Sequence, residues 1–342
     1  MNSHSASRER GRVTFRSTVF VCGLLLLVLL TILVIASLIG SESLPIMTSL
    51  CALTGKSNCG LSAEQQAILF DIRLPRVLLA AAVGMCLAAA GAAYQALLRN
   101  PLAEPYLLGV SNGAAVGTMV SLVFLGSEEW TRPVMAFAGA LVASFAVYQL
   151  ARSRAGASPE RLILAGVIVT TFLSSAIVFI TTLMDATRIR SFTFWLLGDL
   201  SGATTGLLAL ALIVAVAGSA ALTVFARPLN LLMLGERDAF DLGVEVGRVR
   251  LIVFLAAGLL VGTSVASSGS VGYVGLVVPH LVRLSFGSDN RLVIPAATLA
   301  GAAFVVVADM LARTLIAPRE LPVGAITALI GAPLFIYLLK RG

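Results

Sequence analysis

The hydrophobic residues of this chain gather into long runs along the sequence. A run of about 20 apolar residues is long enough to cross the hydrocarbon core of a membrane, and it must be helical there because lipid offers the backbone no hydrogen bonds. We predict ten membrane-spanning helices, at 18–40, 74–98, 106–126, 133–151, 161–184, 205–226, 249–267, 271–286, 292–313 and 323–339.

The composition indicates the same class of protein. Hydrophobic residues make up 58% of the 342 residues and charged residues 12%, and the mean hydropathy is +0.98. A chain with so few charges cannot cover a water-soluble surface. The predicted fold class is therefore an all-α polytopic membrane protein, with a single transmembrane domain over residues 1–342.

The positions of Lys and Arg predict how the chain is oriented. With the amino terminus in the cytoplasm, 16 of the 24 Lys and Arg residues fall on the cytoplasmic side. The positive-inside rule then favours ten spans with both termini cytoplasmic and residues 1–17 as a cytoplasmic tail. This distribution accounts for the net charge of +7 without a basic domain, so we expect no nucleic-acid partner.

A weak internal repeat lies in two of the hydrophobic spans. A shift of 178 residues gives six identities within nineteen positions. An odd number of predicted crossings separates the two copies, so they would be inverted relative to each other, a common plan for membrane transporters. The matched residues are Val83, Gly84, Ala88, Gly91, Leu98 and Pro101, which fall on Val261, Gly262, Ala266, Gly269, Leu276 and Pro279.

Two of the four cysteines, Cys51 and Cys59, share the predicted outer loop at 41–72. In an oxidising compartment such a pair can close a small disulfide loop. The sequence leaves two outcomes open, a disulfide between Cys51 and Cys59 or two free thiols.

Side chains suited to catalysis or metal binding are rare. The chain has two histidines, His4 and His280, so paired-histidine zinc or haem sites are not expected. Asp309 is the clearest acid inside a predicted span, and such residues are functional candidates by default. Its position near a helix end beside Arg313 instead favours a structural ion pair. We expect no metal site and no catalytic residue on this chain.

Several motifs together resemble one transport family. They are RLPR (73–76), LLRNPLAEPYLLGVSNGAA (97–115), LNLLMLGERDAFDLGV (229–244), VASSGSVGYVGLVVPHLVRL (265–284), GSDNR (287–291), ADMLAR (308–313) and ELPVGAITALIGAPLFIYLL (320–339). In this order and spacing they resemble the permease subunits of bacterial ABC importers for iron–siderophores, haem and vitamin B12, the FecCD family.

The resemblance implies a ten-span permease in the bacterial inner membrane that forms a homodimer around a central path. Two separate cytoplasmic ATPase subunits would drive it with ATP and Mg, so no cofactor is expected on this chain. A periplasmic or lipid-anchored binding protein would deliver the substrate. A ferric siderophore is the first substrate candidate, with cobalamin second and haem third.

Two other functional classes share some of these features. An ion-coupled secondary transporter could also contain inverted repeats, but it should carry acids at the membrane centre and would not need an apolar loop at 228–246. A membrane-embedded enzyme would need a cluster of catalytic or metal-binding side chains, and the sequence displays none.

The resemblance assigns the outer face to docking of the binding protein. Arginines at the RLPR start of the second span and at the end of the ninth would meet acidic residues of that protein, as exposed charges around the outer mouth. The alternative role is that of snorkelling anchors at the lipid headgroups. These residues are Arg73, Arg76 and Arg313.

The cytoplasmic loop at 227–248 is the predicted coupling site. Its apolar residues need a partner if they lie outside the membrane, and two short helices hinged at Gly235 would present them to a groove on the ATPase, as in the family. Lying flat on lipid is the alternative. The proposed contacts are Leu231, Leu234, Gly235, Glu236, Phe240 and Leu242, with Glu236 and the neighbouring charges as a polar rim.

A cytoplasmic gate is the third site that the resemblance implies. In relatives the NPLA turn and the loop before the fifth span narrow the path, which points to Asn100, Leu102, Pro159 and Glu160. Relatives can carry small hydroxyl residues in place of the last two. A purely structural turn, shaped by the neighbouring prolines, is the alternative.

Overall fold

A helix lies in each of the ten predicted spans of the computed structural model, which describes residues 14–55, 59–125, 130–153 and 156–341. Within this part of the chain, seven helices are long and apolar enough to cross a membrane, and three shorter apolar helices lie in the third, eighth and tenth spans. The ten are α1 (Phe15–Leu38), α4 (Leu74–Leu97), α5 (Val110–Val120), α6 (Thr131–Ala151), α7 (Pro159–Thr181), α9 (Thr205–Val224), α12 (Val246–Ser268), α13 (Val274–Phe286), α14 (Asn290–Thr314) and α15 (Val323–Arg341).

Shorter elements connect these helices. Two are π-helical turns, η1 before α4 and η3 after α5, and one is the 3-10 turn η2. The connecting elements are α2 (Ile46–Leu53), α3 (Ala63–Ala67), η1 (Ile68–Arg73), η2 (Pro105–Leu108), η3 (Ser121–Leu125), the antiparallel pair β1 (Arg152–Ser153) and β2 (Gly156–Ala157), α8 (Ala186–Leu196), α10 (Ala226–Leu234) and α11 (Glu236–Asp241).

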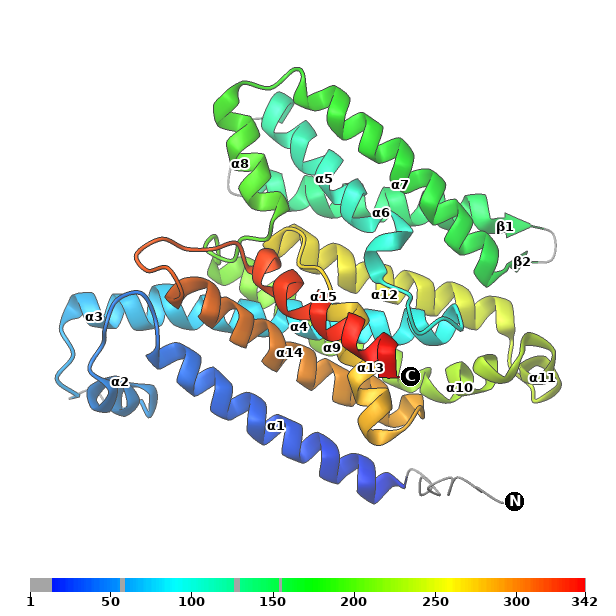
Figure 1. Ribbon diagram of the computed structural model, residues 1–342, viewed down its shortest axis with the longest axis horizontal. Coiled ribbons are helices and arrows are strands. Elements are labelled where there is room, and N and C mark those ends of the chain that lie inside the picture. Colours follow the sequence, from blue (N-terminus) through cyan, green and yellow to red (C-terminus); the bar gives the residue numbers. More distant parts are fainter. Residues whose placement is uncertain (1–13, 56–58, 126–129, 154–155, 342) are drawn as a thin grey trace.

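The two ends of the helix bundle carry different elements. Figure 1 places α2 and α3 at one end and α10, α11 and the β1–β2 hairpin at the other. Helix α1 begins and α15 ends toward the end with α10 and α11, so both lie at one end of the bundle, which the positive-inside rule assigns to the cytoplasm. Residues 1–13 of the predicted tail lie outside the described residues.

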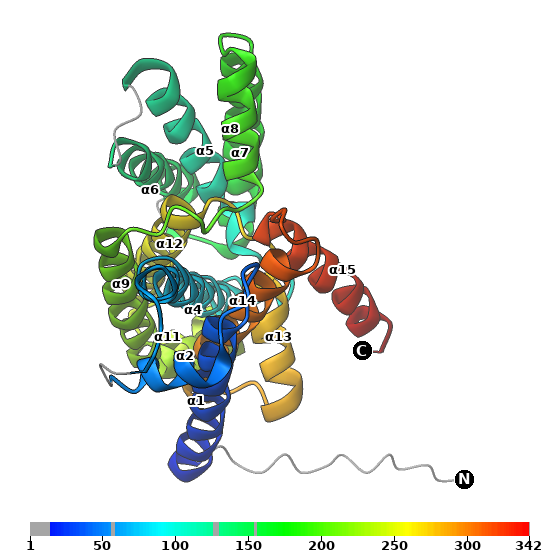
Figure 2. The same ribbon diagram turned by 90° about the vertical axis from the view of Figure 1, so that its left-hand side faces the viewer.

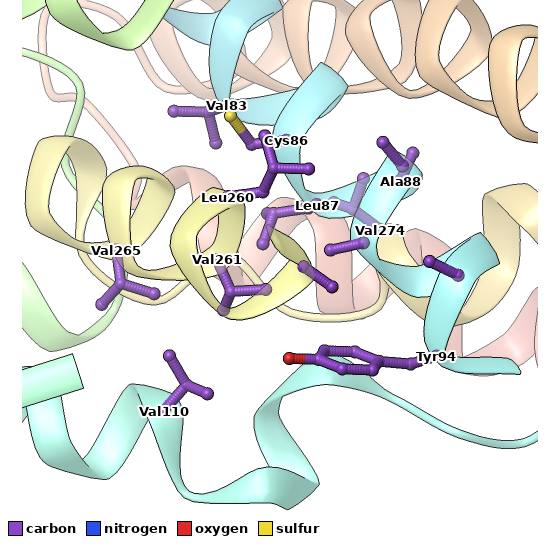
Figure 3. Packing of buried hydrophobic residues seen from close by; sticks show 14 of the residues in the cluster. Val83, Cys86, Leu87, Ala88, Tyr94, Val110, Leu260, Val261, Val265 and Val274 are labelled. Atoms are coloured by element: carbon purple, nitrogen blue, oxygen red, sulfur yellow. The ribbon is translucent and has the colours of Figure 1, made fainter. Parts of the chain in front are cut away.

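Helix α4 is the centre of the fold. Twenty of its 24 residues are buried, and α9, α12 and α14 surround it when the bundle is viewed from its outer end (Figure 2). Figure 3 places Leu87 of α4 close to Leu260 and Val261 of α12. Helices α5 to α8 form a second layer on the far side of α12 (Figure 1).

Glycines allow several helices to pack backbone against backbone. A Cβ on Gly84 would lie 2.1 Å from the carbonyl oxygen of Gly301 in α14. In α5, a Cβ on Gly113 or Gly117 would lie 2.4 or 2.0 Å from a carbonyl oxygen of α6. Any larger residue would force these helices apart, so Gly113 and Gly117, four positions apart in α5, serve helix packing.

The internal repeat has a structural counterpart only in its first half. Helices α4 and α12 run in opposite directions (Figure 1), as an inverted repeat requires. Helix α4 continues through Gly91, whereas α12 ends at Ser268 and the matching Gly269 has a left-handed φ of 69°. The matched prolines also differ, because Pro279 lies inside α13. The sequence match therefore extends past the structural equivalence.

The third predicted span, 106–126, is not the continuous helix that we expected. The chain forms the short turn η2, reverses at Gly109 with φ 77°, and only then enters α5. Pro105 at the start of η2 supplies no N–H, and Gly109 adopts the left-handed region at little cost. Helix α5 is consequently short.

The outer loop contains a disulfide. Cys51 and Cys59 are bridged, with 5.7 Å between their Cα atoms. Of the two outcomes that the sequence left open, the bridge is the one that the structure contains. It joins the end of α2 to the segment that leads into α3.

Candidate functional site

The outer arginines form a buried ion cluster instead of an exposed ring. Arg76 places Nε 2.9 Å from Asp309 Oδ1 and Nη1 2.7 Å from Glu320 Oε2. Arg313 places Nε 3.0 Å from Asp309 Oδ2, so the predicted structural pair between Asp309 and Arg313 is confirmed. Asp309 itself has no exposed surface.

Arg73 and Arg313 also donate hydrogen bonds to carbonyls at and just after the end of α1. Arg73 donates to the carbonyl of Leu38 at 3.2 Å and to the carbonyl of Glu42, while Arg313 Nη2 donates to the carbonyl of Ala36 at 3.2 Å. The last carbonyls of a helix have no partner within it, and a cation there also complements the helix dipole. These guanidinium groups therefore satisfy the outer end of α1.

The expectation that these arginines are exposed is wrong. Arg73, Arg76 and Arg313 are 4%, 8% and 3% exposed. The physical reason is the demand for donors inside the protein, where Asp309 and the carbonyls of α1 would otherwise lack partners. Burial of this kind also excludes simple snorkelling at the headgroups.

One of the three arginines keeps a route to the outer surface. Arg76 and Glu320 line a partly open cavity of about 200 Å³ together with Asp199 and Ser201 of the loop between α8 and α9. The side chain of Glu320 is 40% exposed. Arg76 therefore has one face on buried Asp309 and one on a carboxylate that solvent reaches.

At the opposite end, α10 and α11 form the predicted pair of short helices with Gly235 between them. Gly235 has φ 150°, a conformation that favours glycine. The outward apolar side chains are Leu234, Phe240 and Leu242, which are 67%, 71% and 62% exposed. Leu231 is partly buried against the core, so it is not part of this exposed face.

Helix α10 is held by hydrogen bonds at the junction of α13 and α14. Asn230 donates to Asp289 at 2.7 Å and accepts from the backbone and side-chain amides of Asn290 at 2.9 and 2.8 Å. Burial disfavours the charge of Asp289, but hydrogen bonds from Arg291 and Asn230 outweigh it and lower the pKa of this carboxyl. Arg283 continues the network from Asn290 to the carbonyl of Ala92 in α4.

Glu236 of the predicted polar rim keeps 41% of its side chain exposed and is also ion-paired. Its Oε1 lies 2.5 Å from Arg250 Nη2 and 3.6 Å from Arg99 Nη2. Arg250 also donates through Nη1 to the carbonyl of Ala157 in the β1–β2 hairpin. This partly exposed carboxylate therefore pairs with guanidinium groups from two other parts of the chain.

The four predicted gate residues occupy two turns on the cytoplasmic side. Asn100 accepts through Oδ1 from the backbone N–H of Leu102 at 2.9 Å, which shapes the NPLA turn, and Leu102 is 43% exposed. Pro159 is the buried first residue of α7, and Glu160 follows as an exposed first-turn acid. Asn100 and Pro159 thus have structural roles in their turns, and Leu102 and Glu160 are the members with free surface.

Comparison with known proteins identifies the family to which this sequence is similar. The sequence pattern of the FecCD transport family matches residues 25–341. The chain belongs to the FecCD transport family. A vitamin B12 import system permease protein of Klebsiella pneumoniae is 40% identical over 334 residues, which cover 95% of each chain.

Two further relatives of this FecCD chain are also named as transport proteins. A hemin transport system permease protein of Yersinia pestis is 43% identical over 281 residues, which cover 80% of this chain and 83% of the relative. An inward-facing structure of a metal-chelate type ABC transporter has a TM-score of 0.82 at 32% identity and covers 95% of this chain and all of its own. The FecCD chain is therefore a multi-pass permease of the inner membrane.

Sequence reasoning missed the partners of this FecCD permease's arginines. Arg99, Arg250 and Arg283 entered the prediction only as cytoplasmic positive charges, and Glu320 was not singled out. Two of them, Arg250 and Arg283, are buried and contact residues of other elements. A basic residue at a helix end gives no sign of its distant partner, so the sequence held no signal that could have identified these contacts.

Proposed function

We propose that this chain is the permease subunit of an ABC importer that moves a metal chelate across the inner membrane, powered by two separate cytoplasmic ATPase subunits. The observation that carries the proposal is the apolar face of α10 and α11. Leu234, Phe240 and Leu242 lie exposed at the cytoplasmic end in a chain of the FecCD family. An apolar face of this kind outside the lipid requires a protein partner.

The arrangement of α11 supports an ATPase contact over adsorption to lipid. In Figure 1, α11 lies at the extreme cytoplasmic end of the bundle. Its exposed apolar side chain Phe240 is flanked by the exposed charges Arg237, Asp238 and Asp241. An apolar centre with a charged rim is typical of a protein interface.

Asp309 is poorly suited to be the ion site of an ion-coupled secondary transporter. A coupled ion would need a membrane-centred acid that is free to bind it. Asp309 is instead paired with Arg76 and Arg313 near the outer end of α14. Each oxygen of its carboxylate lies within 3.0 Å of a guanidinium nitrogen, so a cation would have to displace a positive charge that is already there.

The permease works as a homodimer around a central path. Helix α7 carries exposed hydroxyl residues at Thr171, Ser174 and Ser175 within an apolar helix. Asn112 of α5 donates to Ser174 Oγ at 2.8 Å and to the carbonyl of Thr170 at 3.1 Å, which fixes this face. Polar groups on a membrane helix belong against another protein surface or a water-filled path, and a second copy would provide both.

The substrate is a metal chelate. The named relatives of this chain belong to vitamin B12 and hemin transport systems, and the related structure is a metal-chelate type transporter. Cobalamin, haem and a ferric siderophore are therefore the compounds to test, with the ferric siderophore as our first candidate from sequence.

Reconstitution tests the proposed function directly. The chain is combined with its cognate ATPase and binding protein, placed in proteoliposomes with ATP and Mg inside, and offered each of the three chelates. We expect ATP-dependent accumulation of one of them. Accumulation driven by a proton or sodium gradient without ATP would instead support a secondary transporter, and the proposed function would fail.

The binding protein docks at the outer face and uses Arg76. Arg73 and Arg313 serve carbonyls of α1, whereas Arg76 lines the outer cavity and is held there by Glu320. An acidic residue of the binding protein would compete with Glu320 for the same guanidinium. The bidentate geometry of Arg suits such an exchange of carboxylates.

Glu320→Gln tests this docking role. Removal of the internal competitor should strengthen binding of the binding protein by about twofold to fivefold, the value of a partly exposed ion pair. Glu64→Gln, which removes an exposed charge from α3, is the control for net charge. If surface plasmon resonance gives the same affinity for both variants, Arg76 is not the docking group.

A further inference from the structure

Three charged residues from different parts of the chain meet next to the two predicted gate turns. They are Arg99, which follows α4, Glu236 at the start of α11, and Arg250 in α12. Glu236 is paired with Arg250 at 2.5 Å and with Arg99 at 3.6 Å. The cluster holds two positive charges and one negative charge.

The cluster reaches both turns of the gate. Arg99 directly precedes Asn100 and the NPLA turn. Arg250 donates to the carbonyl of Ala157, two residues before Pro159. Its side chain is 5% exposed, whereas those of Glu236 and Arg99 are 41% and 36% exposed. The contacts of Arg250, which reach the hairpin, are therefore more protected from water. The contact of Arg99 with Glu236, next to the NPLA turn, is longer and more exposed.

The backbone of Arg99 ends α4. Arg99 has φ 49°, a left-handed conformation that glycine adopts more readily. The N–H groups of Arg99 and Asn100 donate to the carbonyls of Ala96 and Gln95, a common left-handed termination of a helix. The side chain at this position pairs with Glu236 at 3.6 Å, whereas a glycine would leave the carboxylate with Arg250 alone.

Gly235 separates α10, which is held at the junction of α13 and α14, from α11. Helix α10, before Gly235, is held at the junction of α13 and α14 by Asn230. Glu236, directly after Gly235, is the first residue of α11 and belongs to the ion cluster. A rotation of α11 about Gly235 would therefore move the Glu236 carboxylate while α10 stays in place.

We propose that Glu236 is a positioning residue that transmits movement of α11 to both gate turns, through Arg99 to the NPLA turn and through Arg250 to the hairpin before α7. The inference rests on the proposed function, because α11 moves when an ATPase subunit bound to it moves. Glu236 touches neither substrate nor nucleotide in this scheme. It converts displacement of a helix into displacement of two turns.

The variant Glu236→Gln removes the charge and keeps a side chain of the same shape. The matched control is Glu245→Gln, because Glu245 pairs with Arg248 at 3.6 Å on the same cytoplasmic face and both side chains are 75% exposed. Both variants are measured as complete complexes with ATPase and binding protein. Uptake, ATP hydrolysis and the amount of ATPase retained are recorded for each.

The expected result for Glu236→Gln is retained ATPase and continued hydrolysis, with transport per ATP reduced about tenfold, within the range of typical coupling between sites. Glu245→Gln should match the wild type. A ratio of transport to hydrolysis equal to that of wild type overturns the proposal. So does a loss of uptake that only follows a loss of bound ATPase, because that pattern indicates a structural role alone.

A distance measurement tests the proposed link between α11 and α7 without relying on transport. Spin labels at Arg161 in α7 and Asp241 in α11, in a background without Cys22 and Cys86, report whether the two helices move together. In dimers with one labelled copy, the wild type should give one narrow distance with and without ATP, and Glu236→Gln a broad one. Equal widths overturn the proposal. If Glu236→Gln does not fold, Arg250→Lys replaces it, since one ammonium cannot reproduce the two-sided contact of Arg250.

The two measurements distinguish a failure of the proposed Glu236 link from a failure of the proposed importer function. A wild-type complex that transports nothing contradicts the proposed function, while the spin-label distances still test the link. A wild-type complex that transports normally, together with a Glu236→Gln complex of normal coupling, contradicts the link alone.

Discussion

Replacement of Leu234 or Phe240 with Asp is expected to detach the ATPase subunit from an otherwise folded permease. Both side chains are about two-thirds exposed or more and lie at the cytoplasmic end. A carboxylate in the apolar centre of an interface loses its hydration without gaining a partner. We expect at least a thirtyfold loss of affinity, about 2 kcal/mol, the size of an interface hot spot.

Pull-down of the ATPase by the purified permease measures this loss, and size-exclusion profiles in detergent check the fold. The fold should survive because α10 is held through buried Leu229 and Leu232 and through Asn230. Phe240→Leu, which keeps the face apolar, is the matched control and should retain the ATPase. Normal recovery of ATPase with both Asp variants would contradict the coupling role and favour contact with lipid.

The sequence predicted the features of this fold that depend on local patterns. The ten apolar runs, the two short helices around Gly235 and the pair of Asp309 with Arg313 each follow from residues within one element or one turn. Hydrophobic period, glycine conformation and i,i+4 spacing act over a few residues, so one sequence is enough to read them.

Contacts between distant residues could not be predicted in this way. Arg76 meets Asp309 across 233 positions, and Arg250 meets Ala157 across 93. Arg73, Arg76 and Arg313 were expected at the surface because the family resemblance gave them a docking role, and the sequence contained no sign of the buried partners that they contact. The break between η2 and α5 was different, because Pro105 and Gly109 were visible in the sequence as local signals.

The outer ion cluster offers the second large effect, through two carboxylates that contact the same guanidinium. Arg76 pairs with Asp309, which is fully buried, and with Glu320, whose side chain is 40% exposed. Loss of one partner from a buried pair costs about 3–5 kcal/mol because the remaining charge is left uncompensated. Loss of a partly exposed partner costs about 0–1 kcal/mol because water replaces it.

Asp309→Asn should therefore strongly destabilise the permease, and Glu320→Gln should hardly change its stability. The first variant leaves Arg313 without a carboxylate and Arg76 with Glu320 alone, at the point where α1, α4 and α14 are joined. Thermal unfolding of both variants in the same detergent measures the difference, with Glu320→Gln as the matched control for loss of one charge. Equal unfolding temperatures would mean that water reaches Asp309, and that the cluster stabilises the outer end of the bundle no more than a surface pair does.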